Sequence, residues 1–116
     1  MSRHFGPTLD SITASVANLQ EVRKEILRPG DWVFVKTSRS VYRIHVLEAK
    51  RFQVSGGWFD RKGLPPTTLS IAGCTWGGSA IKVDIVAACG LRLEFGNRLV
   101  TSPIQKIFVL PRGCDN

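Results

Sequence analysis

An eight-residue segment, 56–63, combines aromatic and cationic side chains between glycines. Trp58 and Phe59 are followed closely by Arg61 and Lys62. Aromatic rings stack on nucleic-acid bases, and neighbouring guanidinium and ammonium groups neutralise phosphates. The segment therefore predicts a surface that binds single-stranded nucleic acid or another polyanion. The same pattern also fits a strand whose rings face inward and whose charges close a turn.

The charge of the whole chain points in the same direction. The 116 residues include 16 Lys or Arg and 9 Asp or Glu, which gives a net charge of +7. Residues 31–62 carry seven of the basic residues and only three acidic ones. Such a surplus favours nucleic acid or an acidic protein as partner. We expect Arg39, Arg43 and Arg51 to extend the binding path, although the charge could equally serve solubility alone.

Two loops each place a tryptophan beside a pair of glycines. They are Gly56-Gly57-Trp58 and Trp76-Gly77-Gly78. Both could line one pocket, with Trp58 and Trp76 as its walls and Phe59 as its floor, which predicts a small-molecule or peptide binding protein as the alternative function. Alternatively, the glycines permit tight bends at the corners of a barrel while the tryptophans close its ends.

Catalytic residues are sparse. Cys74 is the best candidate for a nucleophile, and His45 is the only plausible base for it, so a hydrolase would depend on these two residues meeting. A simpler interpretation makes Cys74 a small apolar residue in a turn and Cys89 a core residue. The sequence shows neither paired carboxylates nor a glycine-rich phosphate loop nor the spacing of a metal site. We therefore expect a non-enzymatic protein without cofactor or metal.

The elements that must position these residues follow from hydrophobic periodicity. An amphipathic helix is predicted over residues 8–28, before Pro29 and Gly30 end it. Its apolar stripe consists of Leu9, Ile12, Val16, Leu19, Val22 and Ile26. The stripe is expected to pack on a sheet, or to pair with the same stripe of a second copy in a homodimer.

From residue 31 to residue 110 the apolar residues alternate with period two. Six to eight short strands follow one another without helices between them, which predicts antiparallel pairing. The predicted fold is α+β and mainly β: an N-terminal helix followed by a small antiparallel barrel or a strongly bent sheet. The run Gly30-Asp31-Trp32-Val33-Phe34-Val35-Lys36 resembles the first strand of SH3-like barrels, and this resemblance implies a barrel of that general character.

The expected organisation is one domain over 8–110, with flexible ends at 1–7 and 111–116. The first residues lack the apolar core of a secretion signal, and no apolar stretch approaches the length of a membrane span. We therefore expect a cytoplasmic protein without a membrane partner. A third class of function is an assembly protein that dimerises through the helix stripe or through a free strand edge.

Overall fold

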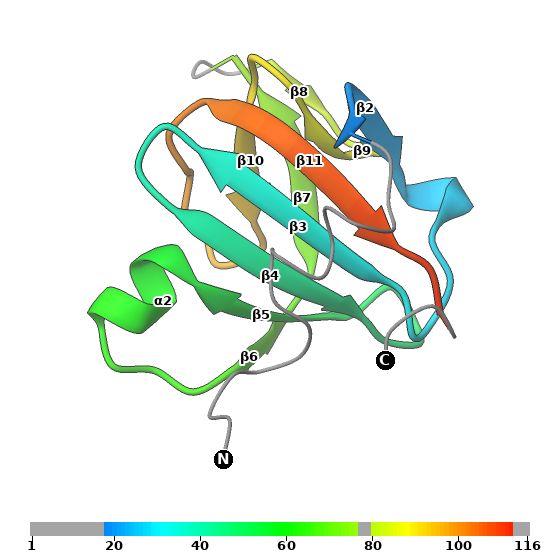
Figure 1. Ribbon diagram of the computed structural model, residues 1–116, viewed down its shortest axis with the longest axis horizontal. Helices are drawn as coiled ribbons and strands as arrows, with labels where there is room; N and C mark the ends of the chain where they lie inside the picture. The colour runs from blue at the N-terminus through cyan, green and yellow to red at the C-terminus, as the bar shows by residue number, and fades with distance from the viewer. Residues whose placement is uncertain (1–17, 77–79, 113–116) are drawn as a thin grey trace.

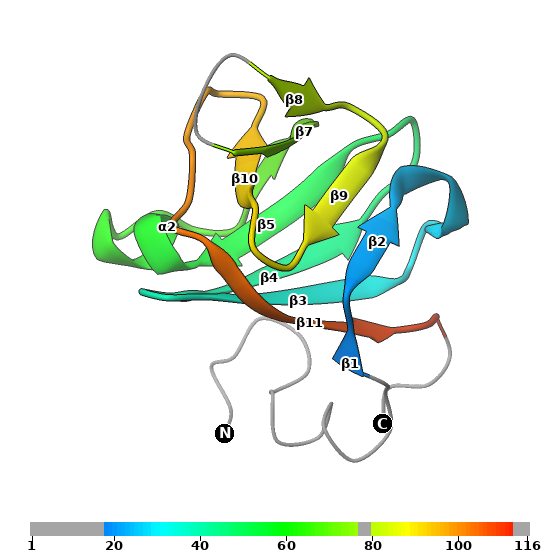
Figure 2. The same cartoon turned by 90° about the horizontal axis from the view of Figure 1, so that it is seen from above.

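The computed structural model describes residues 18–76 and 80–112, which form two layers of β-structure (Figures 1 and 2). One layer is a six-stranded sheet, in the spatial order β1 (Asn18–Leu19), β11 (Ile104–Leu110), β3 (Trp32–Thr37), β4 (Val41–Val46), β5 (Phe52–Gly56) and β6 (Thr67–Leu69). The other layer contains a three-stranded sheet of β10 (Arg92–Phe95), β7 (Ile71–Thr75) and β8 (Ile81–Lys82), and the pair β2 (Glu21–Arg23) and β9 (Ile85–Ala88).

The helical structure of the described residues consists of two short turns. One is the 3-10 turn η1 (Lys24–Ile26), and the other is the single α-helical turn α2 (Gly57–Arg61). α2 follows β5 directly and lies at one end of the six-stranded sheet (Figure 1).

Alternating side chains of the six-stranded sheet build the core between the layers. In β4 the buried residues Tyr42, Ile44 and Val46 alternate with partly exposed ones. β3 lies between β11 and β4 and is apolar on both faces, as a central strand requires. Its Val33 and Val35 belong to the main core. On the opposite face, a second cluster is made by Trp32, Phe34, Phe108 and Leu110.

The predicted helix over residues 8–28 is wrong where the structure tests it. Residues 18–28 contain β1, β2 and η1, whereas residues 8–17 lie outside the described residues. β2 pairs with β9, and Val22 is buried between exposed Glu21 and Arg23. Apolar residues three positions apart fit one face of a helix, but they also fit two short strands that each pack one residue against the core, as Leu19 and Val22 do here. With Val22 in the core, this part of the stripe is not available for a dimer.

The predicted barrel, and with it the SH3-like character, is also wrong. The six-stranded sheet ends at β1 and β6, which do not pair with each other, and the remaining described strands form separate sheets. All the pairs are antiparallel. The apolar faces of the layers are covered by one another, as in face-to-face sheet packing, so closure into a barrel is not needed to bury them. Residues 81–88, in which apolar residues alternate, form the two strands β8 and β9 with a turn at Val83 and Asp84 between them.

Candidate anion-binding site

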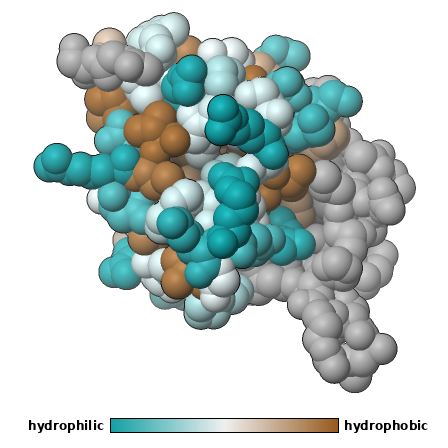
Figure 3. Space-filling view, turned by 90° about the vertical axis from the view of Figure 1, so that its left-hand side faces the viewer, coloured by the Kyte–Doolittle hydropathy of each residue, from teal (hydrophilic) through white to brown (hydrophobic). Residues whose placement is uncertain are grey.

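A hollow of about 500 Å³ lies between the β3–β4 turn, α2 and the segment that leads into β11. We call it the arginine hollow. Its lining residues are Ser38, Arg39, Ser40, Tyr42, Trp58, Arg61, Arg92, Leu99, Val100, Thr101, Ser102 and Pro103. Three of them are arginines, and none is Asp or Glu. Figure 3 faces this end of the molecule, where hydrophilic side chains surround smaller hydrophobic patches.

The position of Trp58 in the arginine hollow depends on two glycines. Gly56 and Gly57 have φ angles of 92° and 47°, which glycine adopts without strain. A Cβ on Gly57 would overlap the ring of Tyr42, so glycine is needed for the close approach of α2 to β4. The N–H of Trp58 then donates to the Tyr42 hydroxyl at 3.2 Å. The chain therefore turns sharply from β5 into α2 and brings Trp58 beside β4.

The β3–β4 turn is held by its own hydroxyl side chains. The Thr37 Oγ1 accepts the N–H of Ser40 at 3.0 Å and the N–H of Arg39 at 3.3 Å. Two bonds join this turn to the segment before β11: the Ser38 N–H donates to the carbonyl of Pro103 at 3.0 Å, and the Arg39 N–H donates to the Ser102 Oγ at 3.3 Å. Two turns that are distant in sequence thus form one continuous wall.

The three guanidinium groups come from three separate segments. Arg39 is exposed on the β3–β4 turn. Arg61, at the end of α2, donates from Nη1 to the Ser40 Oγ at 2.8 Å, and Arg92, in β10, donates from Nη1 to the Thr101 carbonyl at 3.4 Å. Within residues 18–76 and 80–112, the ion pairs are those of Arg23. Among the described residues, no carboxylate therefore forms an ion pair with an arginine of the arginine hollow.

A second hollow of about 390 Å³ adjoins the first and shares Ser40 and Arg61 with it. It adds Arg43, whose Nε donates to the Ser55 Oγ at 3.3 Å. It also contains Asp60, which accepts the N–H of Gly56 at 3.3 Å. Arg43 thus lies beside the arginine hollow, but its own hollow contains a carboxylate.

The remaining predicted site residues lie elsewhere or point away. Phe59 is fully buried and packs in the core against Tyr42 and Phe95, so its ring has no face for a ligand. Lys62 is exposed, with Nζ 6.0 Å from the centroid of the Trp58 ring. A base that stacks on that face of Trp58 must displace Lys62.

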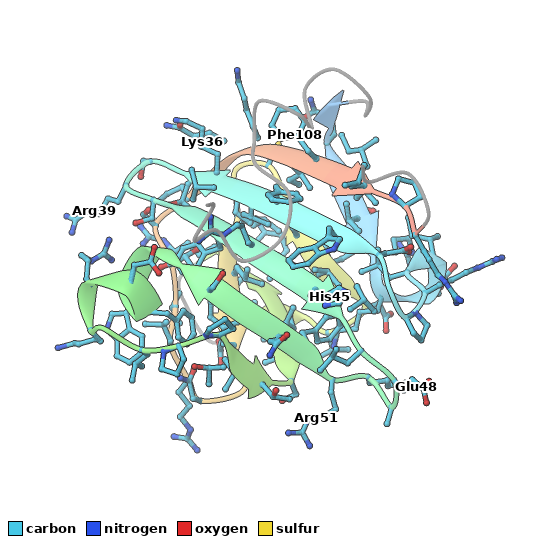
Figure 4. All side chains as sticks on the ribbon, turned by 60° about the horizontal axis from the view of Figure 1, so that its bottom comes forward. Lys36, Arg39, His45, Glu48, Arg51 and Phe108 are labelled. Carbon is cyan, nitrogen blue, oxygen red and sulfur yellow. The ribbon has the colours of Figure 1, made fainter. Side chains whose placement is uncertain are left out.

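Arg51 and Trp76 are separated from the arginine hollow. Arg39 precedes β4 and Arg51 follows it, so they lie at opposite ends of this strand (Figure 4). Trp76 follows β7 in the other layer, is 59% exposed and contacts Lys82, whose Nζ lies 5.4 Å from the ring centroid. The two tryptophans of the glycine loops therefore do not line a common pocket among those found in the described chain.

The structure does not bring Cys74 and His45 together. Cys74 is buried in the core, where its Sγ donates to the carbonyl of Val86 at 3.4 Å. His45 lies on the outer face of the six-stranded sheet and stacks on Trp32 with ring centroids 4.2 Å apart (Figure 4). Burial raises the pKa of the Cys74 thiol to about 11, which disfavours the thiolate that a nucleophile needs.

Another hollow, of about 360 Å³, lies near η1 and the β4–β5 turn. Its charged lining residues are two lysines, Lys24 and Lys50, and two acids, Glu25 and Asp84, so its charges balance. Among the described residues, no group of three or more His, Cys, Asp or Glu side chains could hold a metal ion. The arginine hollow is thus the strongest candidate site.

Sequence reasoning missed Arg92 and the wall formed by residues 99–103. Arg92 is one of the alternating polar residues of a strand, and nothing in its neighbourhood distinguishes it from a solvated side chain. A signal for the wall does exist: Thr37-Ser38-Arg39-Ser40 and Thr101-Ser102-Pro103 are both hydroxyl-rich turns. Their meeting follows from the pairing of β3 with β11, which places the end of one strand beside the start of the other.

No protein-family model, curated protein or solved structure matches the chain. None of the helices in the described residues has the length and apolar character that crossing a bilayer requires. The residues of the arginine hollow are therefore the basis on which a function is proposed.

Proposed function

We propose that this protein is a non-enzymatic binding module for single-stranded nucleic acid, with the arginine hollow as the site that holds phosphate. The observation that supports the proposal is that Arg39, Arg61 and Arg92 line one hollow whose described lining residues include no carboxylate. Arginine presents planar, forked donors that match phosphate oxygens. Like charges that make no ion pair with a described carboxylate repel one another in the folded protein, and an anionic ligand relieves this repulsion.

Trp58 supplies the second part of the proposed recognition. It lines the same hollow as the three arginines, and its backbone is held to Tyr42. Stacking of a base on an aromatic side chain contributes about 1–3 kcal/mol. Phosphate contacts with the arginines and a base against Trp58 would together select a nucleotide chain over a simple anion. Arg43 and Lys62, which flank the arginine hollow, extend the basic surface.

Fluorescence anisotropy with a labelled single-stranded oligonucleotide tests the proposal, with matched controls that the chain itself provides. Arg61→Gln removes a guanidinium of the arginine hollow, and Arg51→Gln removes the same charge from the opposite end of β4. Trp58→Leu and Trp76→Leu form a second matched pair.

We expect Arg61→Gln and Trp58→Leu each to weaken binding by about 5- to 150-fold, which corresponds to losing about 1–3 kcal/mol. The two controls should bind nearly as the unmodified protein does. Equal losses in Arg61→Gln and Arg51→Gln would mean that only the net charge attracts the oligonucleotide, and the site would be refuted. Duplex of the same sequence serves as a comparison, because no described helix is long enough to enter a major groove.

A further inference from the structure

The arginine hollow has more positive charge in one place than a single internal phosphodiester requires. An internal phosphodiester carries one negative charge. A terminal phosphate, which is a monoester, carries about −1.5 to −2 at pH 7 and offers three strong acceptor oxygens. Three arginines that line one hollow therefore match a terminal phosphate better in charge and in number of acceptors.

The hydroxyl groups of the arginine hollow add further donors. Ser38, Ser40 and Ser102 line it, and the Ser40 Oγ accepts a hydrogen bond from the Arg61 Nη1 at 2.8 Å. A hydroxyl that accepts from a guanidinium keeps its own hydrogen for an acceptor on the ligand. The hydroxyl of Tyr42 likewise keeps its hydrogen for a ligand, because it accepts the N–H of Trp58. The hydroxyls of Ser40 and Tyr42 thus add donors to the lining that the arginines provide.

The size and the fixed walls of the arginine hollow also suit a single nucleotide. Its volume of about 500 Å³ lies within the range of pockets that bind a small ligand. A hollow of this size has room for one nucleotide rather than several. The hydrogen bonds from Ser38 to Pro103 and from Arg39 to Ser102 join two turns into one wall. Arg61 ties α2 to the same turn through Ser40.

We propose that the arginine hollow recognises the phosphorylated end of a single strand, with the terminal phosphate held by Arg39, Arg61 and Arg92 and the terminal base against Trp58. This inference rests on the proposed function, which it deepens by naming the chemical group that is recognised. If the inference is correct, the protein binds a strand end or a nucleoside monophosphate more tightly than the interior of a long strand.

The test uses three oligonucleotides of one sequence, carrying a 5′-phosphate, a 3′-phosphate or hydroxyls at both ends, each titrated with the full-length protein. One phosphorylated oligonucleotide should bind about tenfold or more tightly than the unphosphorylated one, as expected for a charge-assisted contact made only by the terminal group. This gain should disappear in Arg92→Gln and persist in Arg51→Gln. A nucleoside monophosphate should compete for the site, whereas the unphosphorylated nucleoside should not.

The pH provides a second readout. The second pKa of a phosphate monoester is about 6, so lowering the pH from about 7.5 to about 5.5 should reduce the gain from phosphorylation while leaving the unphosphorylated oligonucleotide less affected. Equal affinity for the three oligonucleotides, with binding still dependent on Arg61, would overturn the end-recognition inference and leave the proposed function standing. Absence of binding by all three, or equal effects of Arg61→Gln and Arg51→Gln, would overturn the proposed function itself.

Discussion

Replacing Gly57 with alanine tests the packing that creates the arginine hollow. Gly57 has a φ of 47°, and a Cβ there would overlap the ring of Tyr42. Gly63 follows the other end of α2 and has a φ of 68°, and a Cβ there would meet no atom within 4 Å beyond its own chain neighbours. Both substitutions therefore impose a left-handed backbone conformation on alanine, but only one of them creates a steric overlap. Gly63→Ala is the matched control.

The size of the effect follows from these two contributions. The left-handed conformation costs alanine about 1–2 kcal/mol, part of which is offset by the smaller entropy of the unfolded chain. Forcing extra atoms into a packed site costs about 1–3 kcal/mol more. We expect Gly63→Ala to lower the free energy of unfolding by about 0.5–1.5 kcal/mol and Gly57→Ala to lower it by about 1.5–4.5 kcal/mol.

Urea denaturation followed by circular dichroism measures both free energies of unfolding. The extra loss in Gly57→Ala should also appear as a melting temperature about 4–12 °C lower than that of Gly63→Ala. Because the overlap pushes Trp58 away from Tyr42, oligonucleotide binding should weaken in Gly57→Ala more than in Gly63→Ala. Equal stability of the two variants would show that α2 does not pack on Tyr42, and the geometry of the arginine hollow would be refuted.

Three further predictions concern the core and its buried polar groups. Phe59→Ala should lower the free energy of unfolding by about 3–5 kcal/mol, as for a large buried aromatic; a loss below about 1 kcal/mol would place Phe59 on the surface. Asp31→Ala should cost about 2–5 kcal/mol, because the Asp31 carboxylate accepts the N–H groups of Arg28 and Arg112 at 2.9 and 2.8 Å; urea denaturation would show this, and an unchanged midpoint would contradict it. Burial raises the pKa of Cys74 from 9.0 to about 11, so the unfolded chain loses this thiol proton at lower pH than the folded protein. The free energy of unfolding should therefore fall between about pH 9 and pH 11, and Cys74→Ala should show a smaller fall; identical pH profiles would refute the assignment.

The β-rich character of the chain was predictable because its strands bury side chains at alternate positions. β4 shows this directly, since Tyr42, Ile44 and Val46 enter the core while Arg43 and His45 do not. The prediction of a helix was wrong because Leu19 and Val22 are three residues apart, and this spacing occurs both in helices and in pairs of short strands. Only the pairing of β1 with β11 and of β2 with β9 decides between them, and pairing is a long-range property.

Part of the candidate site was also predictable from the sequence. Trp58, Arg61 and Arg39 belong to the predicted surface and do line one hollow, because α2 packs beside the β3–β4 turn. Phe59 differs from Trp58 by one position on a helical turn, which is enough to direct its ring into the core. The sequence did not show that residues 57–61 form a helical turn, so it could not show which of the two rings faces the core. Arg92 enters the hollow from β10, far away in sequence, so local composition gave no sign of it.

The most direct test of the arginine hollow uses the three tryptophan indole N–H signals in a proton–nitrogen NMR titration with a single-stranded oligonucleotide. Trp32 lies on the outer face of the six-stranded sheet, Trp58 lines the arginine hollow, and Trp76 follows β7. Each therefore reports on a different surface. If the proposal is correct, the indole signal of Trp58 shifts together with backbone signals of residues 38–42 and 99–103, while those of Trp32 and Trp76 stay in place. Movement of the Trp76 or Trp32 signal with an unchanged Trp58 signal would contradict it.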